Sequence, residues 1–356
     1  MLKKEKKKSE TIPGTLRIKH TDLKTYEKTN NDWKKNSKEF PNAYFVIDLY
    51  KAHGNENLII IDKVDERFVK GQLSPDGKCQ GARINQLPDG RKIDKAFSLF
   101  AEDLTIHPET SHSHWDVIYK NPNGKYAYCY TLDKVQNSKK IKYNLVKEFE
   151  KKYDVIYKKA YSNLNNKENK IHIAIFTLLK TYMRVGNEIY YKIHNSKGLT
   201  TLKKSDVKIN GNRINFKYIE KGGVPMEIEE EFPDEYVNTL KRILSELKDD
   251  DFIFTGKDNK PLKDTDFESA FQEYTGIKFY PHIVRSYYAT KSVEDFLDKK
   301  KEAEKKEVRD LFLSIAEKLG HKKFNKKHNA WENSPTVTIS HYINPELLEK
   351  VEKITK

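Results

Sequence analysis

Side chains that bind or attack phosphate occur in three short segments of the C-terminal half. Arg184 ends an apolar stretch within the letters MRVGNE, where an unpaired guanidinium would be costly. His282 and Arg285 stand three residues apart in HIVRSYYAT, a spacing that puts both on one helix face. His321 follows in LGH, and Tyr342 in PTVTISHYINP. Taken singly, these residues would be interpreted as a helix cap, a surface pair and a packed tyrosine.

Taken together and in this order, the segments resemble the catalytic domain shared by type IB DNA topoisomerases and tyrosine recombinases. Between the first two segments, GLTTLK and RINFKYIEKGGV resemble the family's hairpin whose turn carries the catalytic lysine, which places that lysine at Lys221. FIFTGK and the stretch from Leu262 to Tyr274 resemble the segment leading to the second arginine. These features favour the topoisomerase side, in particular the small viral and bacterial enzymes. The resemblance covers roughly residues 112–356.

The resemblance implies a role for each of five residues in DNA strand transesterification. Tyr342 would be the nucleophile that forms a 3′-phosphotyrosyl link. Arg184 and Arg285 would hold the non-bridging oxygens with a fork geometry that lysine lacks, and His321 would be a further donor. Lys221 would protonate the departing 5′-oxygen. A free phenol has a pKa of about 10, so it needs a cationic site to react near neutrality.

No cofactor or metal is expected. The two arginines, the histidine and the lysine would carry the phosphate charge without a metal ion, and acidic residues form no cluster with metal-binding spacing. The chain has no Gly-x-x-x-x-Gly-Lys-Ser/Thr phosphate loop. Rejoining would reverse the first step and need no ATP.

Two features depart from the family pattern. The letters KKFNKKHNAWEN stand between His321 and the tyrosine segment as an apparent insertion, which we interpret as a mobile loop that contacts DNA phosphates. Because of it, His328 and His341 remain alternatives to His321. At the position of His282, recombinases usually have histidine and topoisomerases often lysine. A capping or surface role for His282 is the alternative.

Further residues are candidates for DNA contacts. Aromatic and basic side chains can lie along the backbone or in a groove, although the tyrosines could equally pack in the fold and any surface lysine would look the same. The candidates are Lys125, Tyr128, Tyr130, Lys139, Lys140, Tyr190 and His282.

The elements that must position these residues indicate an α+β fold with two domains. We expect a disordered basic tip at 1–20, a β-rich N-terminal DNA-clamp domain at 21–138, and a mainly helical catalytic domain with a small β-sheet at 139–356, joined around 135–142. The runs Ala43–Ile47 and Leu58–Ile61 have β texture. A hairpin at 116–130 would set Tyr126, Tyr128 and Tyr130 on one face of its last strand.

The catalytic half shows helical periodicity interrupted by one sheet. Helices are predicted at 143–161, 171–183, 233–248, 264–275, 282–297 and 308–319. Residues 207–228 alternate like strands, with Asn210-Gly211 as a hairpin turn.

Composition narrows the class of protein. The 356 residues carry a formal net charge of +14, with a surplus of seven basic residues in each of 1–140 and 141–356. Two cysteines exclude a disulfide scaffold and a Cys-rich zinc site. The chain has no membrane-length apolar run and no secretory signal in its first residues. We expect a cytoplasmic or nucleoid-associated protein (a viral factory, virion or nucleus also fits), not secreted and without membrane contact, that binds double-stranded DNA.

The leading hypothesis is a monomeric type IB topoisomerase that clamps duplex DNA and relaxes supercoils. The alternative is a tyrosine recombinase or integrase that uses the same chemistry in a synaptic tetramer. The lysine hairpin and the β-rich N-terminal half favour the topoisomerase. A third hypothesis, a catalytically dead DNA-binding module, conflicts with the complete set of five candidate catalytic residues.

Overall fold

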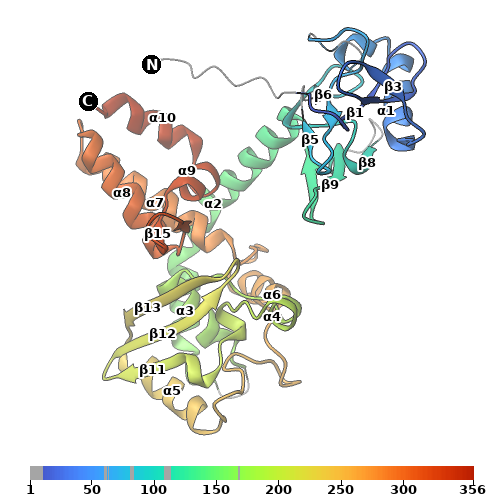
Figure 1. The fold of residues 1–356 in the computed structure, drawn as a ribbon. Coiled ribbons are helices and arrows are strands. Elements are labelled where there is room, and N and C mark those ends of the chain that lie inside the picture. The colour runs from blue at the N-terminus through green and yellow to red at the C-terminus, as the bar shows by residue number, and fades with distance from the viewer. Residues whose placement is uncertain (1–10, 60–61, 63, 81–83, 108–113, 167–168) are drawn as a thin grey trace. The chain divides into compact units, whose positions relative to one another are not determined.

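The computed structural model describes residues 11–356 except 60–61, 63, 81–83, 108–113 and 167–168. The chain divides into two compact units, residues 1–140 and 141–356 (Figure 1). The fold is α+β, with short strands dominating the first unit and helices the second. Among the helices of the described residues, none combines the length and the apolar character needed to cross a bilayer.

Short antiparallel strands build most of the N-terminal unit. One sheet has the order β3-β2-β1-β4-β5, a second has the order β10-β9-β8, and β6 pairs with β7. The strands are β1 (Leu16–Ile18), β2 (Thr25–Lys28), β3 (Trp33–Lys35), β4 (Gln72–Leu73), β5 (Cys79–Gln80), β6 (Ile84–Gln86), β7 (Lys92–Phe97), β8 (Glu102–Ile106), β9 (Val117–Lys120) and β10 (Tyr126–Cys129). Strand β1 begins inside the stretch 1–20 that the sequence assigned to a disordered tip.

The β interpretation of 43–47 is wrong, because these residues belong to helix α1 (Pro41–Ala52). Its buried side chains are Ala43, Val46, Ile47 and Tyr50, which follow the three- and four-residue spacing of one helix face. Pro41 occupies the first turn, where its missing N–H has no helical partner to lose. The second apolar run contributes a 3-10 turn (Glu56–Leu58) and the buried Ile59, and its last two residues lie outside the described part.

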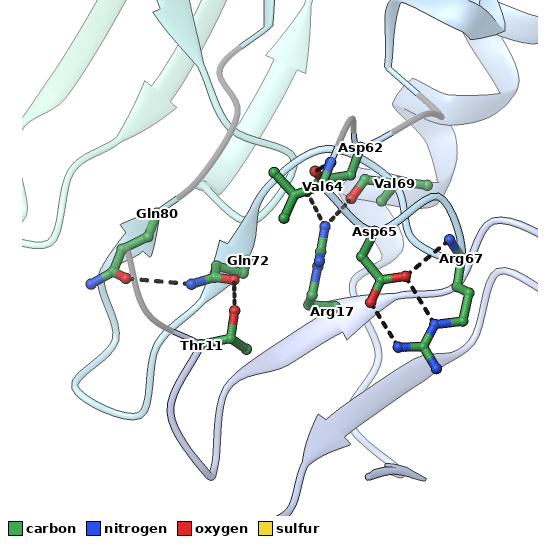
Figure 2. Close-up of polar contacts among 9 residues, drawn as sticks. All are labelled: Thr11, Arg17, Asp62, Val64, Asp65, Arg67, Val69, Gln72 and Gln80. Atoms are coloured by element: carbon green, nitrogen blue, oxygen red, sulfur yellow. Dashed lines mark hydrogen bonds and ion pairs between the residues drawn. The ribbon is translucent and has the colours of Figure 1, made fainter. Parts of the chain in front are cut away.

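A buried arginine ties the sheet of this unit to the neighbouring loop. Arg17 on β1 pairs with Asp62 and also donates to the Val69 carbonyl oxygen at 3.3 Å (Figure 2). Arg67 nearby makes a fork-like contact with Asp65, at 2.9 and 2.8 Å. The Arg17 pair is buried whereas the Arg67 side chain is exposed, so loss of one partner would leave an uncompensated buried charge only in the first pair.

The predicted hairpin before residue 130 is confirmed as β9 and β10, joined by a turn with Gly124 at φ 77°. Tyr126 and Tyr128 are exposed on one face of β10, and Tyr130 lies just beyond the strand and is half-buried. Helix α2 (Leu132–Ser162) follows almost at once. The boundary between the two units falls within this helix, which begins about ten residues earlier than its apolar periodicity indicated.

The second unit contains the remaining helices and two small sheets. The helices are α3 (Ile171–Thr181), α4 (Glu188–His194), α5 (Asp234–Ser245), α6 (Asp264–Thr275), α7 (Ile283–Lys299), α8 (Lys305–Lys318), α9 (Thr336–His341) and α10 (Pro345–Ile354). The strands are β11 (Val207–Asn210), β12 (Arg213–Glu220), β13 (Val224–Glu231), β14 (Lys322–Asn325) and β15 (Ala330–Asn333). The predicted helices are confirmed, whereas α4, α9 and α10 were not predicted.

Two apolar cores hold this unit together. The larger surrounds α3, whose side chains are almost all buried, and includes the inward faces of α2, α5 and α6 and of the sheet β11-β12-β13. The smaller joins α7, α8, α9 and α10, which group beside one another in orange and red in Figure 1. Tyr342 belongs to this smaller core.

The predicted mobile loop at 322–333 is instead a β-hairpin. Lys322 pairs with Asn333 and Asn325 with Ala330 across β14 and β15. Trp331 packs against the larger core, and its ring meets Phe324 edge-on at 5.5 Å between centroids. The strands read KKFN and AWEN, with one aromatic residue in each, and the Lys- and Asn-rich composition of the whole segment concealed them.

Candidate active site

Arg184 is held at the start of a tight loop after α3. The helix ends at Tyr182, which adopts a left-handed conformation with φ 55°. The loop then passes so close to Gly198 that a Cβ there would lie 2.7 Å from the Arg184 carbonyl oxygen and from two backbone atoms of Gly186. Only glycine fits at this contact, and the Leu199 amide donates to the Arg184 carbonyl at 2.8 Å.

The guanidinium of Arg184 forms an ion pair with Glu220, the last residue of β12. The Glu220 side chain is 1% exposed, and that of Arg184 is 28% exposed. Burial lowers the pKa of Arg184, but the attraction of Glu220 and of the Tyr342 phenol outweighs it and raises the pKa overall. A guanidinium at the end of an apolar helix needs a partner, and Glu220 is that partner.

Arg285 on α7 is 1% exposed, and its guanidinium bonds to the backbone of two other segments. One nitrogen donates to the Tyr182 carbonyl at the end of α3, and Nη2 donates to the Leu319 carbonyl at 2.7 Å. The Nε atom is buried without a hydrogen-bond partner among the described residues. Arg285 therefore joins α7 to the ends of α3 and α8. Its Nε–H is a guanidinium donor that no described residue accepts.

His321 follows Gly320, which ends α8 with φ 67°. Its Nε2 lies 3.1 Å from Nη2 of Arg285, and its Nδ1 lies 2.8 Å from the Thr338 hydroxyl. A guanidinium can only donate, so Nε2 accepts and Nδ1 carries the proton in this arrangement. Burial of the ring, and then the charges of Arg285 and Arg184, lower the pKa of His321 to about 3. The imidazole is therefore neutral near pH 7.

Tyr342 lies at the end of α9, 5% exposed, against the residues just described. Its ring centroid is 4.6 Å from that of His321 and 5.4 Å from the guanidinium carbon of Arg285. The phenol acts to raise the pKa of both Arg184 and Arg285, although burial, the larger effect, lowers that of Arg285 overall. One tyrosine, two arginines and one histidine from four separate segments thus meet at one point.

Lys221 occupies the turn between β12 and β13, as predicted. Its side chain is exposed, and Nζ lies 5.4 Å from the centroid of the Tyr190 ring on α4. Both residues line a cavity of about 320 Å³ that is also lined by Arg184, Glu220 and His282. The lysine and the first arginine therefore face the same space.

Two more groups lie beside Tyr342. The His282 ring, at the start of α7, is 5.2 Å from the Tyr342 ring. The surface of His282 is exposed, but many atoms surround its ring. Desolvation by these atoms is the largest cause that lowers the pKa of His282, and the charges of Arg285, Lys142 and Arg184 lower it further. The Nζ atom of Lys142 on α2 lies 5.3 Å from the Tyr342 ring centroid and donates to the His341 carbonyl oxygen.

The alternative histidines have other surroundings. His328 lies in the exposed hairpin turn, and its Nδ1 is 2.6 Å from Glu332. His341 is exposed and meets Lys142 through its backbone. Only His321 of the three has its ring against Tyr342 and Arg285, so the geometry favours His321.

All of the predicted DNA contacts stay predictions, and five of these residues belong to the N-terminal unit. They are Lys125, Tyr128, Tyr130, Lys139 and Lys140. The last two lie on exposed turns of α2, and Tyr128 is 41% exposed.

Glu220 and Lys142 lie at the site but were not predicted. Glu220 carried a usable signal, because it continues the inward-facing alternation Ile214, Phe216, Tyr218 and would be an acid at a core position. Lys142 carried none beyond its place on a helix rich in lysine. Among the described residues, no group of three or more His, Cys, Asp or Glu side chains is arranged to hold a metal ion.

Comparison with known proteins gives one family match and one similar viral protein. The family model for the eukaryotic DNA topoisomerase I catalytic core matches residues 133–342, more than half of the chain. A DNA topoisomerase 1B of Acanthamoeba polyphaga mimivirus is 25% identical over 248 residues, which cover 61% of this chain and 72% of that protein.

Two solved structures of the XerH site-specific recombinase bound to difH DNA are also similar. Both are 16% identical and cover 56% of this chain. The post-cleavage complex has a TM-score of 0.33 and the pre-cleavage complex 0.34. The matches span about half of each recombinase chain, 51% and 52%.

Proposed function

The chain belongs to the family of the eukaryotic DNA topoisomerase I catalytic core and is a DNA topoisomerase, and we propose that it relaxes supercoiled duplex DNA as a type IB enzyme. In this proposal one strand is cut through a 3′-phosphotyrosyl intermediate and then rejoined, without ATP or a metal ion. The observation that carries the proposal is the meeting of Tyr342 with both guanidinium groups and His321.

The first step attaches the enzyme to DNA. The Tyr342 oxygen attacks phosphorus, its proton passes to solvent water, and the bond from phosphorus to the 5′-oxygen breaks. Arg184 and Arg285 bind the non-bridging oxygens, where charge builds up as the pentacovalent state forms. The exposed edge of Arg184 and the unpartnered Nε of Arg285 are donors that remain for this purpose.

His321 and Lys221 complete the set. Because His321 Nε2 accepts from Arg285 in this structure, its proposed role as donor requires a proton at that nitrogen when phosphate is bound. The anionic phosphate favours this change, since a nearby negative charge stabilises an imidazolium. Lys221 protonates the leaving 5′-oxygen, and in the reverse step accepts that proton as the 5′-hydroxyl attacks the phosphotyrosine. The bond is conserved as a phosphodiester throughout, so no ATP is needed.

DNA binding by both units completes the proposal. The N-terminal unit would act as a clamp through Lys125, Tyr128 and Tyr130, and Lys139 and Lys140 would contact phosphates near the junction. Tyr190 and His282 would contact DNA at the cavity. The net charge of +14 supports strong, salt-dependent affinity for duplex DNA. We expect the protein to be a monomer. We expect it to act in the compartment that contains duplex DNA, which is the cytoplasm or nucleoid, a viral factory, a virion or a nucleus.

The test is relaxation of negatively supercoiled plasmid by purified protein in EDTA without nucleotide. Stepwise relaxation under these conditions, with protein that sediments as a monomer, supports the proposal. Denaturing a reaction on nicked duplex and mapping the DNA-linked peptide should identify the segment that contains Tyr342. Relaxation that requires ATP or magnesium, or attachment through another residue, would contradict it.

One observation favours a second candidate, a tyrosine recombinase. His282 lies against the nucleophile candidate, and that position resembles the recombinase pattern more than the topoisomerase pattern. Strand exchange between two paired sites, by a protein that assembles as a tetramer and relaxes no plasmid, would support the recombinase instead.

A further inference from the structure

The side chain of Glu220 occupies a position where the sequence pattern of β12 calls for an apolar residue. Along this strand Ile214, Phe216 and Tyr218 point inward and are buried, and Glu220 is the next residue in that alternation. Its carboxylate is 1% exposed, and burial raises the pKa of Glu220 despite the opposing effect of nearby cations. A buried carboxylate destabilises a fold unless it has a compensating partner, so its contacts need an explanation.

Those contacts link the hairpin to two other parts of the site. Oε2 pairs with the guanidinium of Arg184. The same oxygen lies beside the chain that leads into His321, since a Cβ placed on Gly320 would be 3.9 Å from it. Oε1 is buried without a hydrogen-bond partner among the described residues, and the carboxylate helps to line the cavity that contains Lys221.

The turn that carries Lys221 has few other anchors. Gly222 and Gly223 both have positive φ, at 80° and 78°, and a Cβ on either would meet nothing within 4 Å. Backbone bonds close the turn, from the Gly223 amide to the Glu220 carbonyl at 3.1 Å, and attach it to the neighbouring segment, from the Lys197 amide to the Ile219 carbonyl at 2.8 Å. The side-chain contacts at this turn are the approach of Lys221 to the Tyr190 ring and, at the residue before the lysine, the ion pair of Glu220 with Arg184.

We propose that Glu220 is a positioning residue, which fastens the Lys221 turn to Arg184 and so sets the lysine ammonium at the leaving oxygen of the phosphate that Arg184 holds. This inference rests on the proposed function, because it requires Lys221 to be the acid. Glu220 keeps one edge of Arg184 occupied and leaves its other donors for phosphate. The pair thereby couples phosphate binding to proton donation.

The chemistry of the leaving group separates this role from a merely structural one. When the bond from phosphorus to the 5′-oxygen breaks, that oxygen takes a proton from Lys221. A substrate with sulfur in place of the 5′-oxygen expels a thiolate, which needs no proton because a thiol is far more acidic than an alcohol. If a residue acts only by placing the acid, its replacement should therefore slow cleavage of the oxygen substrate but not of the sulfur substrate.

The experiment measures single-turnover cleavage of matched oxygen and sulfur duplexes by wild type, Glu220→Gln, Lys221→Ala and the double variant. Glu220→Gln keeps the shape and removes the charge. With oxygen, we expect Lys221→Ala to lose the roughly 10²–10⁴-fold that a general acid contributes, and Glu220→Gln to lose about tenfold or more. On the duplex with sulfur at the 5′ leaving position, Lys221→Ala and Glu220→Gln should both cleave at nearly the wild-type rate. The double variant should be about as slow as Lys221→Ala alone.

The control is Glu229→Gln on β13, an exposed glutamate 3.7 Å from Arg213, which should behave as wild type on both substrates. Thermal unfolding of each variant checks folding, and Glu220→Asp provides a second variant that keeps the charge and should restore part of the rate.

The outcomes distinguish failure of the inference about Glu220 from failure of the proposed role of Lys221. If sulfur rescues Lys221→Ala but not Glu220→Gln, Glu220 acts on Arg184 or on the fold alone and the inference is wrong, while the proposed acid stands. If sulfur rescues neither, the assignment of Lys221 in the proposed function fails first. Unchanged or faster oxygen cleavage by Glu220→Gln would also overturn the inference, because the carboxylate would then be a competitor of phosphate.

Discussion

The Nη2 atom of Arg285 lies 3.1 Å from Nε2 of His321, and this contact determines which nitrogen of the imidazole carries the proton. The guanidinium donates, so the histidine accepts at Nε2 and donates from Nδ1 to Thr338. Two candidates for phosphate binding therefore satisfy each other in this structure. A bound phosphate would replace the histidine as the acceptor of the Arg285 proton.

Replacing Tyr342 with phenylalanine should abolish covalent DNA attachment while leaving duplex affinity close to that of the wild type. The substitution removes only the phenolic oxygen, and the ring still packs against His321 and Arg285. The measurement is gel trapping of labelled duplex after denaturation, together with a binding titration. Tyr161→Phe, a tyrosine outside the site, serves as the control. An adduct formed by the Tyr342 variant would assign the nucleophile elsewhere.

Arg285→Lys should slow cleavage by about 10²–10³-fold, which is typical for loss of one donor to a developing charge. It should also lower the melting temperature, because one ammonium cannot reach the Tyr182 and Leu319 carbonyls as the buried guanidinium does. Arg184→Lys should slow cleavage by a similar factor. Its melting temperature should fall less than that of Arg285→Lys, because the Arg184 side chain is partly exposed. Equal stability loss in both variants would disagree with the burial difference.

Gly198→Ala should distort the loop that holds Arg184. A Cβ would stand 2.7 Å from backbone atoms of Arg184 and Gly186, and backbone cannot yield as a flexible side chain can. We expect a fall in both melting temperature and cleavage rate. Gly256→Ala is the matched control, because its Cβ would meet only the Asp258 carboxylate at 3.4 Å. Wild-type behaviour of the Gly198 variant would show that the close approach is absent in solution.

Stability of the protein should fall as pH drops from about 6.5 toward 3, in part because of His321. The pKa of His321 is lowered to about 3 in the folded state and is near 6.5 in an unfolded chain, so the unfolded state binds the extra proton in this window. The contribution is complete above pH 6.5 and is lost at about 1.4 kcal/mol per pH unit between the two values.

His321→Asn should make this dependence shallower. Denaturant unfolding at pH 7 and pH 5 for wild type and variant gives the comparison, in which titrating groups remote from the site cancel; His282, whose charge also acts on His321, is replaced by asparagine in both proteins of a second pair. An identical pH dependence in both proteins would mean that the imidazole titrates normally in the folded state.

Removing charge from the β14–β15 hairpin should weaken DNA binding, because fewer phosphates would be neutralised. Lys323, Lys326 and Lys327 are exposed on this hairpin, which begins directly after His321. Their replacement by alanine should reduce the slope of log affinity against log salt by up to about 0.9 for each phosphate that is no longer neutralised. Replacement by arginine keeps the charge and should preserve the slope. A slope unchanged by alanine would show that the hairpin does not bind DNA.

Local sequence pattern predicted most of the helices and strands of the second unit. The periodicity of α3, α5, α6, α7 and α8 and the Asn-Gly turn between β11 and β12 were sufficient, because each depends on spacing within one segment. It failed at 43–47, where an apolar run fits a helix face as well as a strand, and at 322–333, where lysines on an exposed hairpin resemble a loop. The roles of the five candidate catalytic residues stay predictions for the experiments above.

By itself, the sequence determined which side chains could take part, because arginine, histidine and tyrosine in characteristic short segments are visible without a fold. Only the tertiary structure decided which of them touch one another. Glu220 pairs with Arg184 across 36 positions, and Arg285 reaches Tyr182 across 103. Such pairings depend on how α3, β12, α7 and the end of α8 pack around shared cores, and no short stretch of chain encodes that packing.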